Sequence, residues 1–510
     1  MQWLALLALA LGLATLVRWP TVPFLDLAPI DPNTPLHMLV GWDLGHGGDL
    51  GHIVSVGQPE GARIRLLALP MVLIAAVFDL ILEDARSGFY VAVWLWVAGT
   101  GLAMAAFVRR LEGSGAVAMM AVCAAPVTVQ ALGNGQFENV AFLTFALGWW
   151  AAMQGRSGLT AVAGALAGFC SPYQGIVFLV LVASTRRWKC VAAGAAGLGV
   201  AAVYFLGVLQ GLDPSNMPAP PLDDQGAALA ELVLGPVFSE ASSPGQRSWL
   251  LLNRPEAQAL GANWTFVPTF NSGFLGLGLL GVGGFGLWRE RNRPGVKALV
   301  LAGAVCVVLA LGKRLALAPG VETVLPMPWA LSVWLPGVSK MQATQRFLTG
   351  PTFVLVLGAA WALRGRLAPL AVLLVAEGLW LAPAHWPAPV RPVVPMTLEL
   401  PAEGTLAIWP GPPTLPARYQ QLTAVVLMRR TAWFQGPHGT QAATPGPDQG
   451  IFVEHWHQED LFGRSVEQWF LDAEPSAVLE LRATPDSLEL RGLPLVRQGC
   501  EIAHCVWLPR

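Results

Sequence analysis

Charged residues are scarce in this chain. Asp, Glu, Lys and Arg make up only 12% of its 510 residues, while 54% are hydrophobic. An ordinary soluble domain carries about a quarter of its residues as charges. The formal net charge of -1 also gives no bias toward nucleic acid. The shortage of charge therefore predicts a membrane protein.

Motifs for nucleotide chemistry are absent. The chain contains no GxxxxGKS or GxxxxGKT phosphate loop, no GxGxxG after a strand and no HExxH. These absences argue against ATP-driven transport by this chain alone and against chemistry on a nucleotide cofactor.

Tyrosine is rare too, with 4 residues against 21 Trp. Trp favours the headgroup layer of a bilayer, so this imbalance agrees with a membrane location.

Cysteine is also scarce, and the six residues are too scattered for a disulfide framework. Four of them lie in or beside apolar segments, where a buried thiol is expected. Cys500 and Cys505 instead close a short loop in the hydrophilic tail. They would pair if the tail faces an oxidising compartment, and they would otherwise remain free thiols.

Long apolar runs occupy most of the first 382 residues. A helix needs roughly 20 apolar residues to cross a hydrocarbon core of about 30 Å. The run at 159–184 is broken by Ser171-Pro172, which predicts two short helices that meet at a bend. With that pair, we predict a mainly α fold, a transmembrane helical bundle of about 11 crossings. The other runs are 3–17, 89–108, 115–133, 139–153, 190–209, 272–288, 298–312, 347–363 and 367–382.

Residues 66–82 form a further apolar run whose path is ambiguous, because Pro70 interrupts it and Asp79 lies near its end. It either crosses the bilayer or lies partly in the interface. If it crosses, residues 18–65 become cytoplasmic. If it does not, residues 18–88 form a single exterior loop.

Basic residues in the short loops predict the orientation, because Lys and Arg are retained on the cytoplasmic side. They fall on one side if 159–184 goes across and back, and the N-terminus is then cytoplasmic. Arg18, just after the first apolar run, taken alone favours the opposite orientation of that helix. The basic residues are Arg109, Arg110, Arg156, Arg186, Arg187, Lys189, those at 289–297, Arg364 and Arg366.

The chain divides into two predicted domains. Residues 1–382 form the membrane domain, which includes a long exterior segment at 210–271. Residues 383–510 begin with a Pro-rich connector and contain short strand-like runs, such as 405–409 and 478–481, between Gly and Pro turns. We therefore expect a small exterior C-terminal domain of the α/β or α+β class.

The first predicted exterior loop holds a dense group of acids and histidines, including Asp31, His37 and Asp43. Carboxylates at the mouth of an apolar bundle can act as general bases or hold a divalent cation. Asp31-Pro32 is also typical of a helix start, with Asp31 as the N-cap. The alternative is an acidic loop that is simply solvated.

Further candidate residues lie at other predicted exterior turns. Gln136 and Glu138 belong to a compact polar turn that could bind a sugar hydroxyl or be a plain turn. Tyr173 follows the predicted helix break, which on its own needs no function. Arg346 precedes a membrane helix, where its planar guanidinium could bind a phosphate or act as an interfacial anchor.

Short motifs follow one another in a recognisable order along roughly the first 380 residues. They are Asp31-Pro32-Asn33-Thr34-Pro35-Leu36-His37, Arg109-Arg110, Asn134-Gly135-Gln136, Ser171-Pro172-Tyr173 and Gln345-Arg346-Phe347. This order resembles GT-C-type membrane glycosyltransferases, including YfhO-like and dolichyl-phosphate-mannose-protein mannosyltransferase-like proteins. Many members carry a paired Asp-Glu early in the first loop, which this chain lacks.

The resemblance implies an enzyme of the bacterial inner (cytoplasmic) membrane that uses a polyprenyl-phosphate sugar donor. Asp31 would act as the general base, and Arg346 would stabilise the charge on the leaving phosphate. His37, Glu138 and Tyr173 would line the sugar pocket.

A divalent cation held by Asp31 and Asp43 is compatible with this chemistry but not required for it. The C-terminal domain would present the acceptor, which could be a glycan, a lipid or a protein.

Two other functions fit the same features. A transporter or flippase for lipid-linked saccharides would share the acidic mouth and the broken helix. In that case Asp31→Asn would impair substrate movement without abolishing a chemical product. A membrane scaffold whose exterior domain binds another protein would tolerate replacement of both Asp31 and Arg346.

Overall fold

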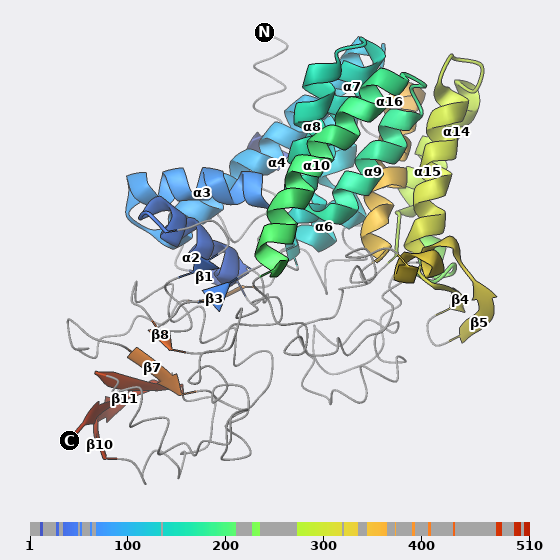
Figure 1. Ribbon diagram of the computed structural model, residues 1–510. Helices are drawn as coiled ribbons and strands as arrows, with labels where there is room; N and C mark the ends of the chain where they lie inside the picture. Colours follow the sequence, from blue (N-terminus) through green and yellow to red (C-terminus); the bar gives the residue numbers. More distant parts are fainter. Residues whose placement is uncertain are drawn as a thin grey trace.

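The computed structural model is mainly helical, with several small β-sheets (Figure 1). It describes residues 11–13, 27–29, 34–48, 52–53, 62–63, 68–133, 136–210, 227–234, 273–318, 321–334, 344–364, 373, 390–392, 406–409, 432–433, 476–481, 494–500 and 504–510. Of the predicted crossings, those at 3–17 and 367–382 fall almost wholly outside these residues.

Successive helices run back and forth between the two ends of a bundle (Figure 1). The passes are α4 (Ala85–Arg110), α5 (Gly115–Cys123) with α6 (Pro126–Gly133), α7 (Phe142–Met153), α8 (Ser157–Cys170), α9 (Pro172–Ala183), α10 (Trp188–Gln210), the π-helical turn η4 (Leu279–Gly283) with α14 (Gly284–Arg289), α15 (Val296–Ala310) and α16 (Thr349–Leu363).

The predicted break at 171–172 separates α8 from α9. Ser171 caps α9 by accepting a hydrogen bond from the Tyr173 N–H at 3.2 Å, and Pro172 occupies the first turn, where its missing N–H costs nothing. Trp149 Nε1 at the end of α7 donates to Ser184 Oγ at 3.0 Å. Helix α9 therefore returns to the end of the bundle where α7 finishes.

A second break, between α5 and α6, was not predicted. The apolar run at 115–133 is interrupted at Pro126, which has no N–H with which to continue the preceding helix. Thr128 Oγ1 donates to the Val122 carbonyl at 2.7 Å across the break. A side chain thus occupies a backbone acceptor that the broken helix leaves open.

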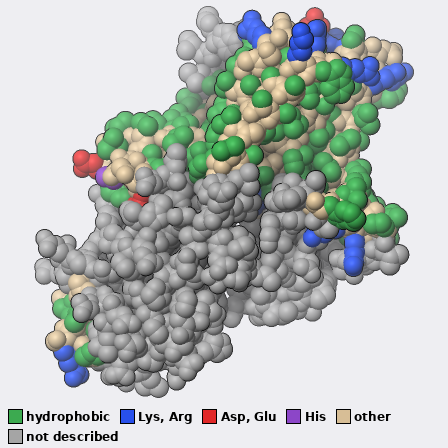
Figure 2. All heavy atoms as spheres, in the orientation of Figure 1, with side chains coloured by type: hydrophobic (Ala, Val, Ile, Leu, Met, Phe, Trp, Pro, Cys, Tyr) green, Lys and Arg blue, Asp and Glu red, His purple; other side chains and the backbone are tan. Residues whose placement is uncertain are grey.

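Basic residues gather at one end of the bundle, called the basic end below (Figure 2). Arg293, in the turn between α14 and α15, pairs with Glu112 after α4 at 3.6 Å. Arg110 and Arg156 both lie over the ring of Trp150. The loops at this end therefore lie close together, and they carry cations that the sequence analysis assigned to one side of the membrane.

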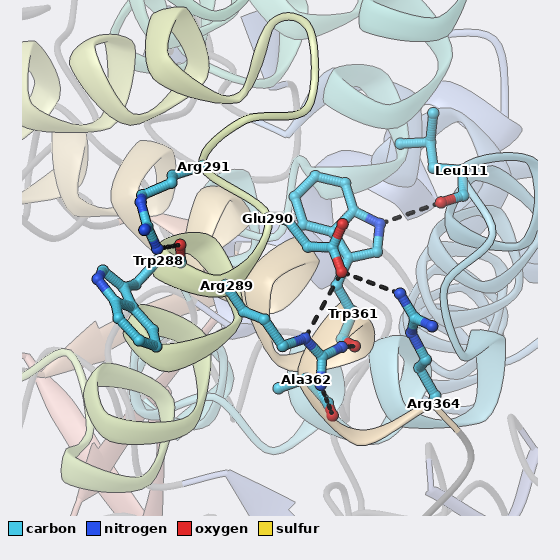
Figure 3. Close-up of polar contacts among 8 residues, drawn as sticks. All are labelled: Leu111, Trp288, Arg289, Glu290, Arg291, Trp361, Ala362 and Arg364. Carbon is cyan, nitrogen blue, oxygen red and sulfur yellow. Dashed lines mark hydrogen bonds and ion pairs between the residues drawn. The ribbon is translucent and has the colours of Figure 1, made fainter.

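The basic end also closes the C-terminus of α16 (Figure 3). Arg289 of α14 donates hydrogen bonds to the carbonyl oxygens of Trp361 and Ala362. Glu290 holds the same guanidinium in an ion pair with its Nε at 3.6 Å. Trp361 Nε1 donates to the Leu111 carbonyl at 3.1 Å. The last carbonyls of a helix have no partner within it, so a cation placed there stabilises the helix end.

Helix α3 (Leu69–Leu82) does not pass between the two ends. The Ala68 N–H just before it donates to the Cys170 carbonyl at 2.8 Å, so α3 starts at the end opposite the basic end. The next helix, α4, finishes at the basic end with Arg110. The two helices together therefore make one pass, and Figure 1 shows α3 extending out to one side of the bundle. The ambiguous run at 66–82 thus forms a helix that does not run from one end of the bundle to the other.

Large apolar side chains cover the outer surface of the bundle. Val203 on α10 is 71% exposed, Leu301 on α15 is 65% exposed and Trp288 on α14 is 60% exposed. In the described part of the chain, three helical stretches are long and apolar enough to cross a membrane: Ala85–Arg110, Trp188–Phe205 and Thr344–Leu363. A broad apolar exterior suits lipid rather than water. The chain is therefore an integral membrane protein.

A strand pair joins a segment near the start of the chain to one that follows α16. β1 (Leu27–Pro29) pairs antiparallel with β6 (Val390–Pro392). Segments that precede and follow the bundle in the chain thus lie on the same side of it.

Two short hairpins are formed by β2 (His52–Ile53) with β3 (Ala62–Arg63) and by β4 (Arg314–Ala318) with β5 (Val321–Pro326). The Leu229 N–H donates to the Ala316 carbonyl, which brings the short helix α11 (Glu231–Leu234) close to the second hairpin.

The tail contains a five-stranded sheet in the order β10-β11-β9-β7-β8. Its strands are β7 (Leu406–Trp409), β8 (Ala432–Trp433), β9 (Ala477–Leu481), β10 (Leu495–Cys500) and β11 (His504–Pro509). β7 pairs parallel with β8 and β9, while β11 pairs antiparallel with β9 and β10. β7 and β9 match the predicted strands at 405–409 and 478–481. The domain boundary at 383 stays a prediction.

Candidate functional site

Three polar segments meet at the end of the bundle opposite the basic end, called the site end below. They are the short helix η1 (Phe137–Asn139), the start of α9 and the short helix η7 (Thr344–Leu348). Gln174 connects them, because its Nε2 donates to Asn139 Oδ1 at 3.1 Å and to the Arg346 carbonyl at 3.4 Å. Residues far apart in the sequence therefore form one polar cluster at the end of an apolar bundle.

A buried ion pair lies at the centre of this cluster. Arg346 Nη1 is 3.0 Å from Glu138 Oε1, and the two side chains are only 13% and 3% exposed. The Arg346 Nε has no acceptor in the described part of the chain. Removing two charges from water is costly, and it is tolerated only when the charges are well paired. The guanidinium is therefore fixed in position while part of its donor capacity remains unused.

Aromatic rings support the Arg346 guanidinium. Its Cζ lies 5.4 Å from the centre of the Tyr173 ring, within the range of a cation–π contact. Tyr173 packs edge-on against Phe347 at 5.4 Å, and Phe347 packs in the same way against Trp329 at 4.9 Å. The helix break that begins α9 thus places Tyr173 beside the cation, as part of a rigid aromatic wall.

Amide and hydroxyl groups extend the cluster away from the ion pair. Thr349 Oγ1 lies 2.8 Å from Gln174 Oε1, to which it can donate. Asn139 Nδ2 donates to Gln136 Oε1 at 3.2 Å. The Gln136 Nε2, in a residue only 4% exposed, has no acceptor within the described residues. This series of hydrogen-bonded side-chain amides therefore ends in the buried Gln136 Nε2, a donor to which a ligand hydroxyl could provide the acceptor.

Helix α2 (Thr34–Gly45) brings part of the first predicted loop to the same place. The His37 ring meets Phe137 edge-on at 5.5 Å and lies 6.2 Å from Phe89. Phe137 immediately precedes Glu138, so His37 stands beside the polar turn. Asp43 lies further along α2 and is only 6% exposed. The predicted loop residues are thus partly folded into the bundle instead of being freely solvated.

Asp31, the predicted general base, lies outside the described residues, between β1 and α2 in the chain. Its role as general base stays a prediction, and so does a divalent cation held jointly by Asp31 and Asp43.

The described residues contain no group of three or more His, Cys, Asp or Glu side chains arranged to hold a metal ion. The structure therefore gives no support of its own for the predicted divalent cation.

The two tail cysteines lie opposite each other in the sheet. Cys500 on β10 and Cys505 on β11 are register partners, and Cys505 is disulfide-bonded. The other four cysteines of the chain are free thiols, and all four are buried.

Sequence reasoning found the charged members of the cluster but not all of its amides and hydroxyls. Asn139 directly follows Glu138 and Gln174 directly follows Tyr173, yet neither was a predicted site residue, and Thr349 was not predicted either. Each is fully or almost fully buried. Their signal was an uncharged polar residue next to a break in an apolar run, since such a residue must find a partner inside the protein.

Comparisons with known proteins give the following picture. Neither the protein-family models nor the curated proteins match the chain. Among solved structures, it is similar to the Archaeoglobus fulgidus oligosaccharyltransferase in complex with Zn and sulfate. The TM-score is 0.42 and the identity 13%, over 93% of this chain and 68% of that one.

The chain is also similar to ArnT from Cupriavidus metallidurans bound to undecaprenyl phosphate, with a TM-score of 0.41 and 14% identity over 99% of this chain and 98% of that one. At such TM-scores, the similarity assigns no substrate and no site residue to this chain.

Proposed function

We propose that this chain is a membrane glycosyltransferase that transfers a sugar from a polyprenyl-phosphate-linked donor to an acceptor at the site end of the bundle. The observation that carries the proposal is the Arg346 guanidinium, buried at the end of an apolar bundle with its Nε unsatisfied in the described residues. An ionisable group held at such a place by a membrane protein indicates function.

Arg346 binds the donor phosphate. The planar Arg346 guanidinium can donate two parallel hydrogen bonds to a phosphate. The single Glu138 carboxylate occupies only some of the N–H donors of Arg346. The lipid tail of the donor would lie among the apolar helices, which leaves its phosphate at the depth of the guanidinium. As the sugar leaves, negative charge grows on that phosphate, and a fixed guanidinium stabilises it.

Glu138 and Tyr173 keep the guanidinium in place before the donor arrives. A cation that is already desolvated and oriented needs little reorganisation when the phosphate binds. Gln136 Nε2, unsatisfied in the described part of the chain, donates to a sugar hydroxyl, and His37 lines the same pocket from α2. Together these residues would select a sugar attached directly to the phosphate.

Asp31 takes the proton from the acceptor hydroxyl as that oxygen attacks the sugar. Asp43 contributes a second carboxylate, and a divalent cation between the two is compatible with the reaction but not needed. What supports a role for Asp31 at the site end is its position in the sequence, three residues before α2, whose His37 meets Phe137 beside Glu138.

The basic end faces the cytoplasm, because short loops rich in Lys and Arg are retained there. The site end and residues 383–510 then face the exterior, and in a bacterial inner membrane this is the periplasm. The N-terminus is cytoplasmic. In that oxidising compartment Cys500 and Cys505 form a disulfide. The exterior domain would present the acceptor.

The test uses purified protein and radiolabelled polyprenyl-phosphate sugars, with release of polyprenyl phosphate as the readout. We expect turnover by the wild type and its loss in Asp31→Asn and Arg346→Gln. Arg291→Gln is the matched control, because it removes an exposed arginine at the basic end.

Unchanged turnover in Asp31→Asn would remove Asp31 from the mechanism. Movement of labelled lipid across vesicles without any released product would instead identify a flippase.

A further inference from the structure

A hollow of about 430 Å³ lies at the basic end, far from the site described above. It is formed by the end of α4, the end of α7 and the turn that leads to α8. Its walls include Arg110, Arg156, Trp150, Trp149, Phe107 and Met153. The volume is within the usual range of small-molecule sites.

Two positive charges converge on one ring in this hollow. The Arg110 Cζ lies 4.4 Å from the centre of the Trp150 ring, and the Arg156 Cζ lies 5.0 Å from the same point. The two guanidiniums are therefore no further apart than the sum of those distances. Like charges at such a separation repel each other; because both side chains are exposed, water screens part of the repulsion, and an anion bound by both would remove the rest.

The protein supplies no such anion in its described part. The acids of this end are engaged elsewhere, because Glu112 pairs with Arg293 and Glu290 pairs with Arg289 and Arg364. Arg110 and Arg156 form no ion pair with any described carboxylate. Arg110 and Arg156 therefore differ from Arg289, Arg293 and Arg364 at the same end, whose charges described carboxylates balance.

The remaining walls indicate an amphiphilic ligand. Phe107 and Trp149 are buried and form an apolar floor, while Met153 is 38% exposed at the outer surface. Trp149 and Trp150 lie at a bundle end, where tryptophans of membrane proteins meet the lipid headgroups. A free phosphate would use the arginines alone, whereas a phospholipid would use the arginines and the apolar wall together.

We propose that the hollow is a binding site for an anionic phospholipid of the leaflet at the basic end, with its phosphate between Arg110 and Arg156. Trp150 holds the two guanidiniums in position, and the first part of an acyl chain runs along Phe107 and Met153. Basic pockets between membrane helices bind lipid headgroups in this way. The site is independent of sugar transfer at the opposite end.

The test compares lipid binding to the full-length, delipidated protein, measured by native mass spectrometry and by titration in detergent. The probes are phosphatidylglycerol, phosphatidylethanolamine and inorganic phosphate. Arg110→Gln/Arg156→Gln is the test variant, and Arg186→Gln/Arg187→Gln is the control, because it removes two exposed charges from the same end. We expect the test variant to bind phosphatidylglycerol about tenfold more weakly or worse. The control should bind like the wild type.

Trp150→Leu, which removes the ring but neither charge, should also weaken phosphatidylglycerol binding. If Arg110→Gln/Arg156→Gln does not fold, phosphatidylglycerol binding by Trp150→Leu tests the proposal in its place. Equal phosphatidylglycerol affinity in both double variants would overturn the proposal, and so would equal affinity of the wild type for phosphatidylethanolamine. Displacement of phosphatidylglycerol by millimolar inorganic phosphate would also overturn it, because the hollow would then be a phosphate site.

Discussion

At the scale of single residues, the Glu138–Arg346 pair separates stability from function. Breaking a buried ion pair by removing one partner leaves an uncompensated charge, which costs about 3–5 kcal/mol. Arg346→Gln should therefore lower the thermal unfolding temperature clearly. Glu138→Gln/Arg346→Gln removes both charges, so it should regain much of that loss.

Neither variant should transfer sugar, because both lack the guanidinium. Unfolding followed in detergent, together with the transfer assay, measures both effects. Activity in the double variant would show that Arg346 serves the fold alone.

Asp79 gives a prediction about pH. Its side chain is fully buried on α3, and neither carboxyl oxygen has a partner in the described structure. Burial, with a further contribution from the charge of Asp84, raises the pKa of Asp79 from 3.8 to about 9. The folded protein thus keeps a proton that the unfolded chain releases, and this group lowers stability as pH rises from about 4 to about 9.

Asp79→Asn replaces the carboxyl by a group that cannot ionise. The variant should therefore be more stable than the wild type, and its advantage should increase between pH 5 and pH 8. Thermal unfolding at several pH values measures this difference. A constant difference across that window would contradict the assignment.

At the scale of helices, close packing of α14 on α16 depends on glycine. A Cβ added at Gly286 would lie 1.8 Å from the Gly358 carbonyl oxygen, so the two backbones touch. Gly286→Ala should force the helices apart, at a cost of about 1–3 kcal/mol.

Gly284→Ala is the matched control, because a Cβ at that position meets nothing within 4 Å. It should leave stability unchanged or raise it slightly, since alanine favours helix. Thermal unfolding of the two variants provides the comparison. Equal effects would show that the close approach does not matter.

The helices were also the part of the fold that the sequence predicted best. Apolar runs long enough to cross a membrane correspond to α4, α10 and α16, because their composition alone decides their environment. The break at 171–172 was predicted because serine and proline define it locally. The break at Pro126 was missed because one proline stands in an otherwise continuous apolar run.

The site was predictable only in part, for a physical reason. Charged residues beside apolar runs are conspicuous, so Glu138 and Arg346 were named, but nothing in the sequence indicated that they pair across more than 200 positions. Thr349 resembles any other residue of α16 until its hydroxyl is found beside Gln174. Such contacts depend on tertiary packing, which local patterns do not encode.

At the scale of the whole molecule, the two ends differ in chemistry, and this difference defines the orientation. Cysteines introduced as Ala28→Cys and Arg391→Cys, one at a time, should both react with a membrane-impermeant maleimide on intact spheroplasts. Both should react because β1 and β6 pair with each other and so lie on the same side of the bundle, which is the exterior side in the proposed orientation. Arg187→Cys, at the basic end, should react only after permeabilisation.

Reaction at one of the two strand positions but not the other would contradict the pairing. Reaction of Arg187→Cys on intact cells would reverse the proposed orientation and place the site in the cytoplasm.

The pairing of β1 with β6 also sets the order of events during biosynthesis. β1 leaves the ribosome early, whereas its partner emerges only after the last apolar run has been synthesised. At typical elongation rates of about 5–20 residues per second, this delay is on the order of tens of seconds. A chain that stops before residue 390 would leave β1 without its partner. The β1–β6 pair can therefore form only after α16 has been synthesised.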